Sequence, residues 1–257
     1  MRRTKLLVAT ALLALACGPG RSAHAPPHAP PPPTPAGAAP PAALPSAEAA
    51  APDFERDAPA PIEETFLGCP PGGDRGGDEA LNLLKNRIDD ATRARTVTFA
   101  ELLALPSPAG TSKRHRAKWS PEDRESIARH EGRPVTLRGF VFDAKREDVE
   151  SPNCHDEDER QKDVHVWLVA QPGDDRSAAV VVEVTPRVRA RHPAWTVPAL
   201  RKLAHDRVAV RVTGWLMFDQ EHGEQLAPHG TSRGATRGTL WEIHPITRIE
   251  LETGGEL

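Results

Sequence analysis

The sequence predicts a mostly β domain, a small five-stranded barrel, preceded by a short helical extension. From Pro134 onward, apolar and polar side chains alternate, as in strands with one buried face. Turn residues divide this part of the chain into five such runs, and a helical run follows the third. The predicted order of elements is therefore β-β-β-α-β-β.

Each element can be placed on the chain. A Gly-containing turn between the second and third strands predicts that these two pair as a hairpin. Gly139, inside the first strand, marks a site for a bend or bulge. The predicted strands are 135–145, 163–170, 178–185, 206–219 and 238–251, and the predicted helix is 197–205.

Before Pro134 the spacing of apolar residues changes to the helical period and predicts three short helices. Asp78 stands at the start of the first, 78–90. Thr98 and Glu101 form a capping box at the start of the second, 98–105. The third opens at Ser120, runs to about residue 130 and has proline in its first turn. We expect these helices to pack on the barrel.

The first residues have the features of a secretory signal. Basic side chains precede an apolar run, 6–16, that is too short to span a bilayer as a helix. The run ends in Ala14-Leu15-Ala16-Cys17, which resembles the lipobox of bacterial lipoproteins. That resemblance implies a lipidated Cys17 and an exported protein anchored in the cell envelope. By the same resemblance, the outer membrane, facing the periplasm, is favoured, because Gly18 replaces the aspartate that retains such lipoproteins in the inner membrane. An ordinary cleaved signal that ends in cysteine is the alternative.

The chain divides into four regions: the signal 1–17, a tether 18–62, the helical extension 63–133 and the barrel 134–257. The tether holds about half of the 27 prolines and is otherwise mostly alanine. Such a composition cannot bury enough apolar surface to fold, so we expect a disordered, extended spacer. The net charge of −3 gives the chain no overall attraction to nucleic acid.

Cysteine usage points to a disulfide. If Cys17 carries a lipid, only Cys69 and Cys154 remain, in a compartment that oxidises thiols. The sequence therefore predicts a Cys69–Cys154 bond that ties the entry segment of the domain to a loop inside it.

The order β-β-β-α-β-β with a glycine inside the first strand resembles the OB-fold, a Greek-key barrel of five strands. The resemblance covers 134–251, and another small barrel or an open α+β sheet is the alternative. The segments NCH, DVHVWLV, VEVTPR, GWLMFDQEH and WEIHPIT are also similar to those of uncharacterised bacterial exported proteins. This second resemblance implies a fold and a location but no activity.

The non-core side of the strands is the predicted site. OB-folds bind ligands on the outer face of strands two and three, next to the loops that join strands one to two and four to five. His155 and His222 lie in those loops. Ionisable or aromatic side chains expected to point outward from the strands are His165, Trp167, Glu183, Glu242 and His244.

The function we expect is binding without catalysis. Trp167 and Trp215 would form a stacking platform, with cationic partners from three arginines. The expected partners are a glycan, a peptide or an envelope protein, besides the membrane itself, and the acidic stretch 156–160 disfavours nucleic acid. Packing of both tryptophans under the helical extension is the alternative. The three arginines are Arg138, Arg187 and Arg211.

A metal-dependent hydrolase is the alternative function. Glu183 and Glu242 would act beside histidines that hold zinc or a similar divalent metal. No HExxH, CxxC or paired DxD spacing is present, so no cofactor is predicted outright, and structural roles for these side chains compete with the catalytic one. The candidate metal ligands are His155, His165, His222 and His244.

Overall fold

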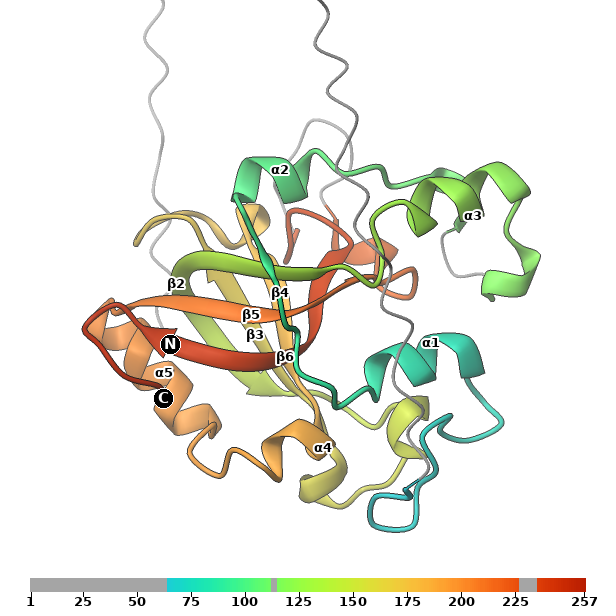
Figure 1. Ribbon diagram of the computed structural model, residues 1–257, viewed down its shortest axis with the longest axis horizontal. Helices are drawn as coiled ribbons and strands as arrows, with labels where there is room; N and C mark the ends of the chain where they lie inside the picture. Colours follow the sequence, from blue (N-terminus) through green and yellow to red (C-terminus); the bar gives the residue numbers. More distant parts are fainter. Residues whose placement is uncertain (1–63, 112–114, 227–234) are drawn as a thin grey trace, which may run out of the picture. The chain divides into compact units, whose positions relative to one another are not determined.

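The computed structural model describes residues 64–111, 115–226 and 235–257. Cys17, the predicted signal and the predicted tether lie outside these residues. Five strands of the described chain form a closed barrel, and a sixth strand lies outside it (Figure 1). Within the described ranges, no helix is long and apolar enough to cross a membrane.

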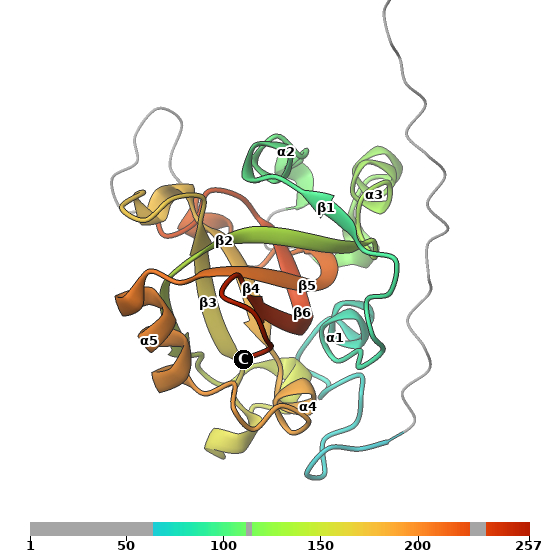
Figure 2. The same cartoon turned by 60° about the vertical axis from the view of Figure 1, so that its left-hand side comes forward.

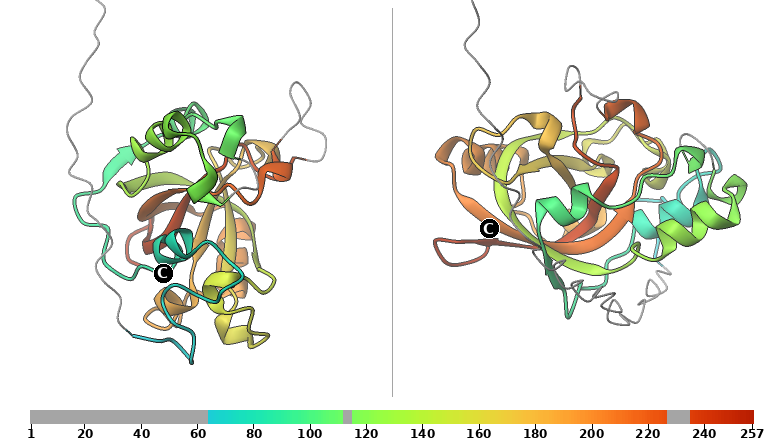
Figure 3. Two further views of the ribbon diagram at one scale, coloured as in Figure 1. Left: turned by 90° about the vertical axis from the view of Figure 1, so that its right-hand side faces the viewer. Right: turned by 90° about the horizontal axis from the view of Figure 1, so that it is seen from above.

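The barrel confirms the predicted fold class. Its strands are hydrogen-bonded in the order β2-β3-β4-β6-β5, and pairing of β5 with β2 closes the ring (Figure 3, right). All neighbours are antiparallel except β4 and β6, which run parallel. The strands are β2 (Pro134–Arg146), β3 (Val164–Val169), β4 (Val180–Val184), β5 (Ala209–Phe218) and β6 (Trp241–Leu251).

Helix α5 (Val197–Asp206) lies between β4 and β5 in the chain, as predicted, and packs against β2 (Figure 2). Its first turn is capped by the Thr196 side chain and contains Pro198. Two elements were not predicted. Helix α4 (Pro186–Arg189) follows β4 directly, and β1 (Arg95–Val97) pairs in parallel with β2 outside the barrel.

The barrel interior is apolar. Alternate residues of each strand point into it, such as Val164 and Val166 of β3, Val182 of β4, Leu216 of β5 and Ile243 of β6. These positions agree with the predicted alternation, in which the neighbouring residues His165, Glu183 and His244 point outward. The closed ring of main-chain hydrogen bonds and this core hold the strands rigidly, so the outward side chains start from fixed positions.

The three lead-in helices are α1 (Glu79–Lys85), α2 (Phe99–Leu103) and α3 (Pro121–Ala128). Their predicted caps are present: Asp78, the Thr98–Glu101 box and Ser120. Helix α1 ends five residues earlier than predicted. At its end the Asn86 side chain donates to the carbonyl oxygens of Pro71 and Pro152 and so joins the loops instead of continuing the helix.

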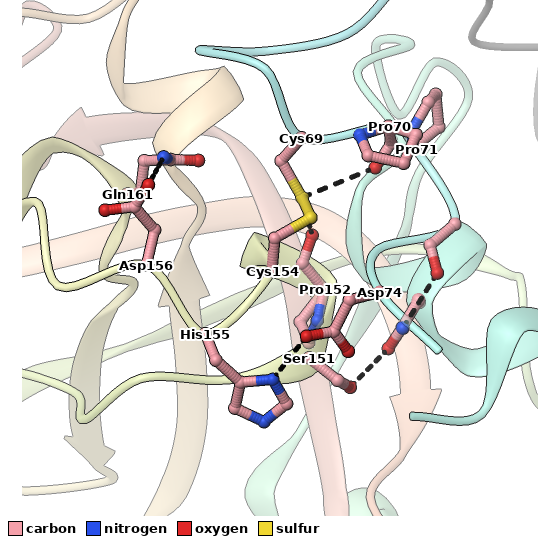
Figure 4. Close-up of a disulfide and its surroundings, with 12 residues drawn as sticks. Cys69, Pro70, Pro71, Asp74, Ser151, Pro152, Cys154, His155, Asp156 and Gln161 are labelled. Carbon is pink, nitrogen blue, oxygen red and sulfur yellow. Dashed lines mark hydrogen bonds and ion pairs between the residues drawn. A yellow bond between two sulfur atoms is a disulfide. The ribbon is translucent and has the colours of Figure 1, made fainter. Parts of the chain in front are cut away.

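The disulfide Cys69–Cys154 joins the entry segment to the loop between β2 and β3 (Figure 4). The two cysteines are 85 residues apart in the chain. The Ser151 hydroxyl donates to Asn82 Oδ1, and Asn82 in turn donates to the Gly72 carbonyl. Segment 64–90, called the cover below, is thereby fixed to the loop 147–163.

Candidate functional site

The outer face of β3, β4 and β6 is buried. His165, Glu183, Glu242 and His244 do point away from the barrel interior, but each is only 1% exposed. They lie on the outward side of the strands, as predicted, but that side is covered and not open to solvent. The cover lies over them, with α1 in front of the strands (Figure 3, left), and Lys85 of α1 reaches into the same region.

The side chains between the barrel and the cover form what we call the buried polar layer. It draws on α1, the loop 147–163, strands β3, β4 and β6, and the described parts of the segment between β5 and β6. Its described members are Lys85, Glu150, Asp163, His165, Glu183, Asp219, His222, Arg237, Glu242 and His244. Most are fully buried, whereas the His222 side chain is 23% exposed at the rim. The layer contains two trios of metal-ligating side chains.

The first trio is Asp163, Glu183 and His244. Their ligand atoms all lie within 4.8 Å of one another. His244 Nε2 lies 4.0 Å from Asp163 Oδ2, and His244 Nδ1 lies 3.4 Å from Glu183 Oε2. Asp163 immediately precedes β3, Glu183 lies on β4 and His244 on β6. Three separate segments of the barrel wall therefore deliver one compact group.

In both carboxylates of the trio, the second oxygen contacts a neighbouring side chain. Asn153 Nδ2 donates to Asp163 Oδ1 at 3.1 Å. His165 Nδ1 lies 3.4 Å from Glu183 Oε1 and 2.5 Å from Glu147 Oε1. The remaining atoms of the trio, Asp163 Oδ2, Glu183 Oε2 and His244 Nε2, have no hydrogen-bond partner in the described structure. Buried polar atoms are almost always paired, so three together require an explanation.

The second trio is Asp219, His222 and Glu242, and it is already filled by a cation. Arg237 Nη1 lies 2.9 Å from Asp219 Oδ2 and also pairs with Glu242 Oε1. His222 Nδ1 lies 2.5 Å from Asp219 Oδ2. The oxygens of this trio thus face a guanidinium and an imidazole, and the trio forms an ion-pair network.

Burial and like charge shift the pKa values of the first trio. Burial and the charge of Glu150 raise the pKa of Asp163 to about 7. Burial and the charge of Glu242 raise the pKa of Glu183 well above its usual range. Burial and the charge of Lys85 lower the pKa of His244 to about 3, so this imidazole is neutral at pH 7. For both carboxyl groups of the trio, burial and like charge thus outweigh the opposing effect of the Lys85 charge on the pKa.

The second trio behaves differently. Burial alone would raise the pKa of Asp219, but the hydrogen bond from His222 and the charges of His222 and Arg237 lower it well below its usual range. Burial alone would lower the pKa of His222, but the bond to Asp219 raises it to about 9. Asp219 is therefore ionised between two cations at pH 7.

The tryptophans of the expected stacking platform do not present open faces. Trp215 is 2% exposed, the Arg87 guanidinium lies 3.3 Å from its ring centroid, and its Nε1 donates to the Asp89 carbonyl. Trp167 is also 2% exposed, and Arg176 lies 3.6 Å from its ring centroid. The prediction of an open stacking platform is therefore wrong, because Arg87 of the cover lies over the ring of Trp215 and Arg176 of the loop after β3 lies over the ring of Trp167.

The three arginines assigned to the platform are dispersed. Arg138 and Arg211 are exposed neighbours on β2 and β5, and Arg138 pairs with Glu252. Arg187 lies on α4, where it donates to the carbonyl oxygens of Glu64 and Cys69 and so holds the cover. None of the three contacts a tryptophan of the platform in the described structure.

The four candidate histidines separate in the same way. His155 lies beside the disulfide, half exposed, with its Nδ1 2.6 Å from Asp74 Oδ2 (Figure 4). His165, His222 and His244 all belong to the buried polar layer, but each faces a different carboxylate set, so they form no four-histidine centre. His244 belongs to the first trio and His222 to the second.

Several members of the layer were missed or underrated from the sequence. Asp163 and Asp219 lie within the predicted strands 163–170 and 206–219 but were given no role there. Glu150 and Arg237 lie in loops, where no periodic pattern distinguishes them from other polar residues. Lys85 carried a usable signal, because it lies four residues after the buried Leu81 and so on the same side of α1.

No protein-family model matches this chain, and no curated protein matches it.

Proposed function

We propose that the protein is a lipid-anchored binding protein of the cell envelope whose OB-like barrel takes up a small cation in the buried polar layer, without catalysis. One observation carries this proposal. Lys85 pairs with Glu150, and Arg237 pairs with Asp219 and Glu242. Among the described residues, no lysine or arginine pairs with Asp163 or Glu183, although both are buried.

A buried carboxylate without a partner costs several kcal/mol when it is ionised. A bound cation removes this cost, so cation uptake and stability are coupled. The burial of Asp163 and Glu183, each 1% exposed, also limits the ligand to a small one. In this conformation a glycan or peptide reaches neither carboxylate, whereas an ion fits between side chains.

The cation is tested by thermal unfolding of the full chain with Mg²⁺, Mn²⁺, Zn²⁺ and the organic cation spermidine. We expect at least one of them to raise the unfolding temperature of the wild type but not that of an Asp163→Asn/Glu183→Gln double variant. Glu252→Gln is the matched control, since Glu252 pairs with Arg138 at the surface. Equal shifts in all three proteins, or no shift in any, would contradict the proposal.

The location is tested separately through Cys17. The resemblance of its surroundings to a lipobox supports lipid attachment. We expect the wild type in the membrane fraction, released by detergent, and a Cys17→Ser variant in the soluble periplasmic fraction. Membrane association that is independent of Cys17 would remove the anchor from the proposal and leave cation binding untouched.

A metal-dependent hydrolase is the second candidate, and the buried pair Glu147–His165 favours it. The pair lies next to Glu183, and the hydrogen bond from His165 is one reason why the pKa of Glu147, which burial alone would raise, falls to about 2. In this function the pair would accept a proton from a water molecule at the site. The test is hydrolysis of phosphoester or peptide substrates in the presence of Zn²⁺ or Mn²⁺. Activity of the wild type that is lost in His165→Gln would show that the protein is a hydrolase and not only a binding protein.

A further inference from the structure

We infer that the cation is a divalent transition-metal ion and that Asp163, Glu183 and His244 are its ligands. This inference rests on the cation binding proposed above and assigns the ion and its site. Nothing in the sequence motifs marks these three residues, since they lie 20 and 61 positions apart and follow no metal-binding spacing. The argument comes from the atoms that the fold leaves free.

Each member of the trio offers one buried atom with no partner. These are Asp163 Oδ2, Glu183 Oε2 and His244 Nε2, and all belong to side chains that are 1% exposed. An unpaired carboxylate oxygen and an unpaired imidazole nitrogen are both costly to bury. All three are Lewis bases, so one metal ion satisfies them together.

The neighbours leave these atoms free for a ligand. The Nδ1 of His244 lies 3.5 Å from Glu242 Oε2, and the Nε2 of the same ring lies 4.0 Å from Asp163 Oδ2. Metal-binding histidines commonly donate their second ring nitrogen to a carboxylate in this way. Asn153 holds the other oxygen of Asp163. The supporting contacts of a metal site are therefore present around the trio.

The separations fit a single ion. Two atoms bonded to one zinc ion at about 2.0–2.2 Å lie at most about 4.4 Å apart. The 4.0 Å between His244 Nε2 and Asp163 Oδ2 is within that limit, and one ligand atom from each of the three side chains lies within 4.8 Å of the other two. Binding of one ion therefore requires the ligand atoms to move closer together by about a few tenths of an ångström.

The donor set indicates the class of metal. One imidazole with two carboxylates suits Zn²⁺, Mn²⁺ and Fe²⁺, whereas Ca²⁺ and Mg²⁺ prefer oxygen alone. Three protein ligands leave at least one coordination position for a water or another small ligand. The second trio is excluded as the main site, because Arg237 and His222 already contact Asp219 Oδ2 and Arg237 also pairs with Glu242 Oε1.

The test uses the full chain, purified without a polyhistidine tag and freed of metal by chelator. Calorimetric titration with Zn²⁺ and Mn²⁺ is expected to give one tight site per chain. Asp163→Asn, Glu183→Gln and His244→Gln are each expected to weaken that site by more than about 100-fold, since loss of a ligand costs at least as much as loss of a supporting contact. Glu252→Gln and His155→Gln are the matched controls outside the site and are expected to bind like the wild type.

A second readout separates ligation from a structural role. Asp163→Asn and Glu183→Gln remove carboxylates that have no lysine or arginine partner, so the metal-free variants are expected to unfold at the same temperature as the wild type or higher. A purely structural role for these carboxylates predicts a lower unfolding temperature. In addition, the metal is expected to raise the unfolding temperature of the wild type and the two controls, but not that of the three ligand variants.

The outcomes are distinguishable. Tight metal binding that persists in all three ligand variants, or that is lost in His222→Gln and retained in His244→Gln, overturns the assignment of the site and leaves cation binding standing. Stabilisation by spermidine but by no divalent metal overturns the inference that the cation is a metal ion and leaves the proposal of cation binding standing. Absence of stabilisation or binding by every cation overturns both.

Discussion

Lys85 Nζ lies 2.9 Å from Glu150 Oε2, and this ion pair, in which Lys85 is buried and the Glu150 side chain is 17% exposed, joins α1 to the loop that leads into β3. Burial alone would lower the pKa of Lys85, but the charges of Glu150 and of other carboxylates in the layer raise it well above its usual range. Lys85 is therefore charged at pH 7, and it attaches the cover to the barrel.

Replacing Lys85 by methionine is expected to lower the free energy of unfolding by about 3–5 kcal/mol, because Glu150 then stays buried without a cation. The double variant Lys85→Met/Glu150→Gln is expected to recover most of this loss. Urea unfolding of the three proteins measures both effects. Arg129→Met is the matched control, since Arg129 pairs with Glu125 at the surface, and no measurable change is expected. A double variant as unstable as Lys85→Met would contradict the pairing.

The pair His222–Asp219 predicts a pH dependence of stability. The folded-state pKa of His222, about 9, lies above the unfolded value near 6.5. Its contribution is therefore complete below about pH 6.5 and is lost as the pH rises through 9. His222→Gln is expected to cost about 2–3 kcal/mol at pH 6 and little at pH 10.

Urea unfolding of wild type and variant at pH 6, 8 and 10 measures this difference. The groups that face His222 are Asp219, Arg237 and Glu242, and Arg237 stays charged across the range. His205→Gln is a suitable control, because His205 is exposed next to Asp206. A cost for His222→Gln that is the same at pH 6 and pH 10 would show that the imidazole acts by packing.

The disulfide Cys69–Cys154 predicts the stability of the cover. The double variant Cys69→Ser/Cys154→Ser is expected to lower the free energy of unfolding by about 2–4 kcal/mol, because the bond closes a long loop in the unfolded chain. Amide hydrogen exchange should increase in the cover and the loop 147–163 and stay unchanged in α5. Faster exchange spread evenly over the barrel would contradict a local role.

Gly214 of β5 predicts a packing limit at the junction of β5 and β6. A Cβ at this position would lie 2.4 Å from the Pro245 carbonyl oxygen and 2.7 Å from Ile246 Cα, both main-chain atoms. Gly214→Ala is expected to cost about 1–3 kcal/mol by overpacking. At Gly76 a Cβ would meet only the side chains of Asp74 and His155, so Gly76→Ala should cost far less. Thermal unfolding compares the two.

The sequence was sufficient for the barrel because period-two alternation is a local property. It placed Val164, Val182 and Ile243 in the interior and Glu183 and His244 on the opposite side, and the structure agrees on both. Alternation shows which side chains share a face, but it does not show what covers that face. The polar outer face was therefore interpreted as solvent-exposed, although the cover buries it.

The contacts that make the site are long-range, and no sequence pattern encodes them. Lys85 and Glu150 are 65 residues apart, and the bond between Trp215 and Asp89 spans 126. The caps of α1, α2 and α3 were predictable because each involves neighbours within three residues. How these helices lie over the barrel depends on side-chain packing that neither propensity nor periodicity describes.

The order of the trio along the chain has a consequence for how the protein matures. Asp163 and Glu183 lie in the first half of the barrel sequence, whereas His244 lies on β6, the last strand of the described chain. If the chain is exported in the N-to-C direction, as proposed, this histidine crosses the membrane after the other two residues. If the trio holds a metal, the site is then complete only after β6 has been delivered and has paired with β4 and β5.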